Sequence, residues 1–171
     1  MPSSRVLPFA CLVLFALLAG CGFHLRQEAV LPASMQRVHV QIADPGSALA
    51  RDLVRALPRT GATVVDEAGP GVAVLAVAVN SVSTDVLSVG GAARANEYSI
   101  RHHVEFSVHA ADGGELVPNQ VIELTREFTF DSTQAVGVNA EIDLLTRELE
   151  RDMVQAILRR LEVVGEAHPG A

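Results

Sequence analysis

Residues 98–110 read Tyr-Ser-Ile-Arg-His-His-Val-Glu-Phe-Ser-Val-His-Ala, and apolar and polar side chains alternate along the whole stretch. Successive side chains of a β-strand point to opposite faces, so this pattern predicts one long strand with two unlike faces. The first face carries Tyr98, Ile100, His102, Val104, Phe106 and Val108; the second carries Ser99, Arg101, His103, Glu105, Ser107 and His109. The strand therefore needs an apolar layer on one side, while its other side meets water or a polar partner.

The neighbouring stretches predict further strands. Asp112-Gly113-Gly114 is typical of a hairpin turn, and residues 117–130 alternate again, with an apolar face of Ile122, Leu124, Phe128 and Phe130. Upstream, residues 72–80 form a continuous run rich in valine and alanine. Such a run predicts a central strand that is covered on both faces. We expect it to continue as far as about Asp85, and we expect a flexible loop over 86–96.

Two helices complete the pattern. Residues 37–42 alternate as a strand, and after the turn at Asp44-Pro45-Gly46, Ser47 is placed to cap a short helix that Pro58 ends. Residues 62–65 suit a short edge strand. The second helix is long and amphipathic, from a cap at Asn139 to Val164; its apolar stripe is Ile142, Leu145, Leu149, Met153, Ile157, Leu161 and Val164.

This order predicts an α+β fold: a two-layer sandwich with two helices packed on one face of a roughly four-stranded mixed sheet. The three long strands run up, down and up. The loops at 86–96 and 131–138 therefore belong at one end of the molecule, and the 111–116 hairpin at the other. We found no repeat and no second domain.

The N-terminus predicts a membrane anchor. Arg5 precedes an apolar run from Val6 to Leu18, which suits a signal sequence and is short of the about 20 residues of a membrane span. The run ends in Leu18-Ala19-Gly20-Cys21, which is similar to a bacterial lipobox. We expect cleavage before Cys21 and a covalent N-acyl diacylglycerol on that cysteine. An ordinary signal peptide that happens to precede a cysteine is the alternative.

These features divide the chain into a removed signal peptide (1–20), a lipidated extended leader (21–35), a folded domain (36–164) and a flexible tail (165–171). The only other cysteine, Cys11, falls in the removed segment, so the mature chain has no internal disulfide. Gly22 follows the lipidated cysteine where aspartate would favour the inner membrane, so we expect the outer membrane.

Composition and motifs argue against several functions. The chain carries 13 basic and 20 acidic residues, and its net charge of −7 opposes binding to nucleic acid. His102 and His103 point to opposite faces of a strand and cannot chelate one metal ion. Glu123 and Glu127 share a face, where a solvated surface explains them better than an acid–base pair. With no catalytic constellation and no cofactor motif, we predict that the chain is not an enzyme.

The N-terminal residues Leu18 to Arg26 resemble the start of the LPS-assembly lipoprotein LptE family, whose mature members begin Cys-Gly-aromatic-His-Leu-Arg. Weaker similarity follows at Glu97-Tyr98, at Phe128 to Asp131 and along the long helix from Asn139. The resemblance spans nearly the whole chain, although only the N-terminal motif is specific. It implies a family fold of two helices on a four-stranded sheet, which agrees with the pattern above.

The resemblance implies a place in lipopolysaccharide transport: a plug and assembly partner of the outer-membrane LptD β-barrel, anchored by lipid on the periplasmic side and held in the barrel lumen. In the family, basic residues in the loops at one tip are associated with binding lipopolysaccharide. Here Arg94 and Arg101 are the candidates, and residues 131–138 offer no basic side chain. The alternative is a stand-alone glycolipid-binding lipoprotein without a barrel partner; an envelope enzyme is a third and more remote possibility.

Overall fold

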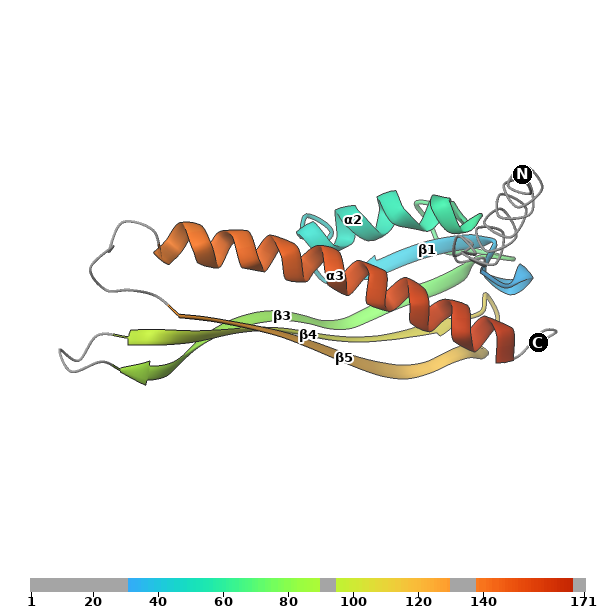
Figure 1. Ribbon diagram of the computed structural model, residues 1–171. Helices are drawn as coiled ribbons and strands as arrows, with labels where there is room; N and C mark the ends of the chain where they lie inside the picture. Colours follow the sequence, from blue (N-terminus) through green and yellow to red (C-terminus); the bar gives the residue numbers. More distant parts are fainter. Residues whose placement is uncertain (1–30, 90–94, 130–137, 168–171) are drawn as a thin grey trace, which may run out of the picture.

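The fold consists of a five-stranded mixed sheet with two helices on one of its faces (Figure 1). The computed structural model describes residues 31–89, 95–129 and 138–167. The elements are η1 (Ala33–Met35), β1 (Arg37–Ile42), α2 (Ala48–Ala56), η2 (Leu57–Thr60), β2 (Thr63–Val64), β3 (Ala73–Val89), β4 (Ala95–His109), β5 (Glu115–Thr129) and α3 (Val138–Ala167). The predicted two-layer α+β sandwich is confirmed.

The strand order is β2-β1-β3-β4-β5. β1 is parallel to both β2 and β3, whereas β3, β4 and β5 form an antiparallel meander. The sheet has five strands instead of about four because the short stretch predicted at 62–65 does pair at the edge, as β2. β3 lies at the centre of the order, as predicted.

Two predictions about β3 are wrong. The strand does not stop near Asp85 but pairs with β4 as far as Val89, which lies opposite Ala95. The loop predicted over 86–96 is therefore shorter, and residues 90–94 lie outside the described residues. β3 is also not covered on both faces: Ala76 is only half-buried and Ala78 is exposed, because no described helix lies on the second face of the sheet.

A β-bulge in the middle of β3 changes which of its alternate side chains face the helices. The register with β4 shifts between Val77, opposite Phe106, and Val79, opposite Glu105. An extra residue in one strand reverses which alternate side chains point to which face. Before the bulge the odd-numbered residues face the helices, and Leu75 is fully buried; after it the even-numbered residues do, and Val82 lies opposite His102.

The core lies between the two layers. The apolar face predicted for β4 is buried: Ile100, His102, Val104, Phe106 and Val108 are all inaccessible to solvent or nearly so. Leu49 and Leu53 of α2 and Met153 and Ile157 of α3 close over this face. Leu31 and Met35 are also part of the core, so the packed domain begins before residue 36, within the stretch expected to be an extended leader.

α3 is longer than predicted at both ends. It begins at Val138, so Asn139 lies in its first turn, and it continues to Ala167. Asparagine is tolerated in a first turn, and the single Gly165 costs a helix about 1 kcal/mol without ending it. Residues 168–171 of the predicted tail lie outside the described residues. α3 crosses β4 and β5 along almost their full length, whereas α2 covers only the half of the sheet near β1 (Figure 1).

The antiparallel meander places the β4–β5 hairpin at one end of the molecule and the other ends of β3, β4 and β5 at the opposite end. Val89 is opposite Ala95 and Glu97 is opposite Thr129, so β3 ends, β4 begins and β5 ends at one tip, which we call the distal tip. The β4–β5 hairpin lies at the other end. There Ala110 N–H donates to Gly114 O over 2.7 Å, and Gly113 takes a φ of 85° that glycine adopts without strain.

Ser47 caps α2 as its position predicts: its hydroxyl oxygen accepts from Ala50 N–H over 3.2 Å. We expect Ser47→Ala to lower the free energy of unfolding by about 1 kcal/mol, because one N–H of the first turn loses its partner. Ser47→Asn should leave stability within about 0.5 kcal/mol, since asparagine also caps well. Urea unfolding of the soluble domain measures both, and equal losses would argue against a capping role.

Candidate functional surface

The face of the sheet opposite the helices is the most distinctive surface of the domain, and we call it the open face. β3, β4 and β5 all present polar side chains to it over the distal half. They are Ser81, Ser83 and Asp85 from β3, Arg101, His103 and Glu105 from β4, and Glu123, Thr125 and Glu127 from β5. Ser99 lies on the same side of β4 but is buried. Both helices lie on the other side, so within the described residues nothing covers this face (Figure 1).

Arg101 and His103 on the open face each lie near carboxylates. Arg101 Nε lies 3.7 Å from Glu123 Oε1, and the ring of His103 lies between Glu123, at 3.6 Å, and Glu105, at 3.2 Å. These side chains are about one-third to one-half exposed, and such pairs contribute little to stability. These pairs compensate the charge of Arg101, and the open face is therefore not basic. It is nevertheless rich in groups that can form hydrogen bonds.

The two predicted ligand-binding residues are not brought together by the described structure. Arg101 is opposite Ser83 and Thr125, six residues into β4, which is about 20 Å from the start of that strand. It therefore lies at the middle of the open face rather than at the distal tip. Arg94 falls outside the described residues, as do Leu18, Ala19, Gly20 and Cys21. Their predicted roles stay predictions.

His102 and His103 point to opposite sides of β4, as predicted. His103 is on the open face, whereas His102 is 0% exposed beneath α3. The Nε2 atom of His102 lies 2.9 Å from Asn80 Oδ1, and its Nδ1 atom has no hydrogen-bond partner within the described part of the chain. Burial lowers the pKa of His102, and the nearby backbone of Leu149 offsets part of that effect. The alternating pattern of β4 predicted that His102 is buried. It could not predict Asn80 as its partner, because Asn80 faces the helix side only as a result of the bulge in β3.

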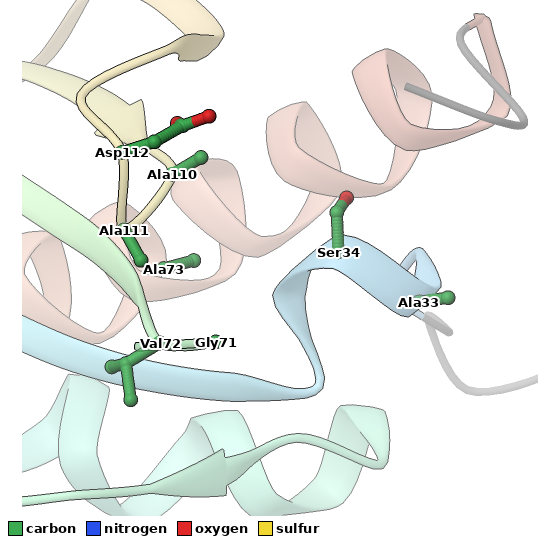
Figure 2. Close-up of a pocket in the computed structure, with 8 residues that line it drawn as sticks. All are labelled: Ala33, Ser34, Gly71, Val72, Ala73, Ala110, Ala111 and Asp112. Carbon is green, nitrogen blue, oxygen red and sulfur yellow. The ribbon is translucent and has the colours of Figure 1, made fainter. Parts of the chain in front are cut away.

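A shallow pocket lies at the hairpin end, between η1, the start of β3 and the turn after β4 (Figure 2). Its lining is mostly alanine, glycine and valine. Its one carboxylate, Asp112, already accepts the Gly114 N–H over 3.0 Å as part of the turn. Ser34 is the other polar side chain. This arrangement has neither a nucleophile with a base nor a charged group free to hold a ligand.

The described residues also hold no group of three or more His, Cys, Asp or Glu side chains placed to bind a metal ion. Among the described helices, none has both the length and the apolar character needed to cross a bilayer. The fold and its surfaces thus define an elongated α+β domain whose most developed feature is a broad polar sheet face, suited to contact with a partner.

Comparison with known proteins identifies the family. The chain belongs to the LptE lipopolysaccharide-assembly family, whose family model matches residues 35–161. That range includes every described helix and strand from β1 to most of α3. The fold is therefore that of an LPS-assembly lipoprotein family, which is not a known enzyme family.

Individual relatives agree along most of their length. The LPS-assembly lipoprotein LptE of Photorhabdus laumondii is 27% identical over 149 residues, covering 87% of this chain and 81% of that protein. The protein of the same name from Yersinia pestis is 29% identical over 150 residues, covering 87% and 72%.

Solved structures share the fold. The solution structure of lipoprotein B from Nitrosomonas europaea superposes with a TM-score of 0.70 at 29% identity, covering 86% of this chain and 94% of that one. The crystal structure of the rare lipoprotein B from Shewanella oneidensis gives a TM-score of 0.62 at 26% identity, covering 72% and 91%.

Proposed function

We propose that this protein is an outer-membrane lipoprotein of the lipopolysaccharide transport machinery, where it acts as the plug and assembly partner of an LptD-like β-barrel and assists insertion of lipopolysaccharide into the outer leaflet. The family match over residues 35–161 carries this proposal. The relatives from Photorhabdus and Yersinia bear the name LPS-assembly lipoprotein. A non-enzymatic role is part of the proposal.

The shape and surface of the domain suit such a role. β3, β4 and β5 together make a long, narrow body, with strands of 17, 15 and 15 residues. The lumen of a large outer-membrane barrel is polar, so a plug needs hydrogen-bonding groups on its exterior instead of an apolar patch. Over the distal half of these strands, the open face supplies serine, threonine and charged side chains, with carboxylates in excess of arginine.

Recovery of the full-length lipidated protein from outer membranes in mild detergent tests this proposal. We expect a large β-barrel protein of the LptD type to co-purify in a constant ratio, identified by mass spectrometry and by its heat-dependent mobility in gels. Isolation of the native protein as a free monomer, in the same detergent that keeps other barrel complexes intact, would count against the plug role.

The alternative is a stand-alone glycolipid-binding lipoprotein. It predicts direct binding of lipopolysaccharide by the soluble domain, with weaker binding in Arg94→Ala. The pairing of Arg101 with Glu123 favours the plug role, because a compensated arginine in mid-face is a poor phosphate site. Equal binding by the wild type and by both Arg94→Ala and Arg101→Ala would remove these two residues as ligand contacts.

The anchor gives a separate prediction. Cys21→Ser should abolish incorporation of labelled fatty acid, because a serine hydroxyl cannot form the thioether that carries the diacylglycerol. Cys11→Ser, in the segment expected to be removed, is the matched control and should label normally. Undiminished labelling of Cys21→Ser would contradict the assignment of the lipid to that residue.

A further inference from the structure

The distal half of β3 is a free sheet edge. β1 pairs with β3 from Ala73 to Val77 only. From Ala78 to Val89, the side of β3 turned away from β4 has no strand partner within the described residues, and Figure 1 shows β3 continuing well past the end of β1. Such an edge presents a row of backbone N–H and C=O groups, which another extended chain satisfies best.

Between the two bulges of β3, this edge has few of the features by which proteins normally prevent strand pairing. Residues 78–89 contain no lysine, arginine or proline, and Asp85 is their only charged residue. Proteins usually protect an exposed edge with charges, proline or bulges. The second bulge in β3 lies at its last residues, between Val86 and Val89, and leaves most of the segment regular.

The other long edge, β5, is protected, and the contrast is informative. Pro118 lies on β5, and the register with β4 shifts opposite residues 106–109. Arg126 also ties β5 to α3 through Asp152, at 2.6 Å. Proline, a register shift and an ion pair therefore protect the β5 edge against strand pairing, whereas the β3 edge between its two bulges has only Asp85.

Exposed apolar side chains are concentrated on the open edge. Val82, Val86 and Leu87 are 42%, 54% and 52% exposed, so three of the seven large exposed hydrophobic residues in the described part of the chain fall within six positions. Val82 and Val86 are opposite His102 and Tyr98, and therefore point to the helix side of the sheet. α2 lies over the half of the sheet near β1 (Figure 1), and the exposure of Val82 and Val86 shows that α3 leaves these two side chains accessible.

We propose that the edge of β3 over residues 78–89 pairs, by β-strand addition, with an extended segment of the barrel partner; this rests on the proposed function and names the surface that carries it. The segment continues the sheet in the position that β1 occupies beside residues 73–77. It places apolar side chains beside Val82 and Val86 and polar ones beside Ser81 and Ser83. A cationic side chain faces Asp85, the one charge of the edge.

Hydrogen exchange of the wild-type chain, free and in its purified complex with the barrel, tests the pairing. In the free chain, the amides of residues 78–89 that point away from β4 should exchange quickly. In the complex we expect them to exchange at least about tenfold more slowly, because strand addition buries their N–H groups. Unchanged exchange there, in a complex that forms normally, would overturn the inference while leaving the proposed function intact. A wild-type chain that recovers no barrel would overturn both.

Variants provide an independent test. Val82→Lys combined with Val86→Lys places charges on the open edge at exposed positions. We expect this double variant to recover at least about tenfold less barrel, with β5 and the core unaffected. The matched control combines Val54→Lys on α2 with Val163→Lys on α3, at sites 43% and 61% exposed, and should recover barrel as the wild type does. Equal recovery by the two double variants would contradict the proposal.

Two further outcomes also decide the matter. Edge protection that rises with concentration in the free chain, together with a dimer in sedimentation, would assign the edge to a second copy and overturn the barrel segment as occupant. If the edge double variant does not fold, as judged by circular dichroism, the exchange measurement on the wild type carries the test alone.

Discussion

Phe106→Ala is expected to lower the free energy of unfolding by about 3–5 kcal/mol, the range seen when a buried aromatic side chain is truncated in a close-packed core. Phe106 is 0% exposed and is one of the largest side chains in the core. It lies opposite Val77 on β3, at the last pair before the bulge. Its removal leaves a cavity under the helices where the backbone of three paired strands resists collapse. Urea unfolding of the soluble domain, followed by far-ultraviolet circular dichroism, measures the loss.

The control is Val121→Ala on the neighbouring strand, where the side chain is 52% exposed. It should change stability by no more than about 0.5 kcal/mol, as surface substitutions usually do. Since domains of this size are stable by about 5–15 kcal/mol, Phe106→Ala should also reduce the amount of folded protein recovered from cells. A loss at Phe106 no larger than the loss at Val121 would mean that the two layers do not pack through β4.

The sequence predicted most of the fold because β4 alternates without interruption. A strand with one apolar face requires a covering layer, and two amphipathic helices were the available cover. The position of Ser47 and the Asp112-Gly113-Gly114 turn were predicted for an equally local reason, since capping and turn formation depend on a few adjacent residues. Each of these predictions needed only the side chains within one element.

The errors in β3 arose from non-local causes. The bulge at Ala78 exchanges the two faces of the strand, and nothing in a run of valine and alanine indicates where an extra residue is accommodated. Residues 86–89 were predicted as loop because they are followed by Gly90-Gly91, yet they pair with β4, since Val86 lies opposite Tyr98. Tyr98 in turn stacks on Phe128 of β5, with ring centroids 5.2 Å apart. Such cross-strand contacts extend strands beyond what local composition predicts.

The candidate surface could be predicted as a face but not as a set of contacts. Alternation placed Arg101, His103 and Glu105 together on the polar side of β4. The pairing of Arg101 with Glu123 depends on the register between β4 and β5, which shifts near Phe106 and Val108. Arg101 looked closer to the distal tip than it is because β4 begins at Ala95, three residues before the predicted start at Tyr98. The free edge of β3 is a property of the whole sheet, because it exists only where β1 ends.

The second large effect is expected from His102, and it is an effect of pH. Burial lowers the pKa of His102 in the folded chain, whereas in the unfolded chain the ring has its ordinary value of about 6.5. Below that pH the unfolded chain binds a proton that the folded chain binds less well, so the free energy of unfolding should fall as the pH is lowered from 7 toward 5.5. The slope for one proton is at most about 1.4 kcal/mol per pH unit.

His102→Leu should flatten this pH dependence, because a leucine of similar size carries no proton and suits a buried position between Ile100 and Val104 on the apolar face of β4. Glu150, beside Leu149 on α3, acts with the opposite sign: burial and then the charge of Asp52 raise its carboxyl pKa. The folded chain therefore binds that proton more readily than the unfolded chain, and its contribution to stability declines as the pH rises through the raised value. Urea unfolding between pH 5.5 and 7.5 in a Glu150→Gln background isolates the histidine. If His102→Leu does not change how steeply the free energy of unfolding varies with pH in that background, the buried ring of His102 is not the cause of the acid sensitivity.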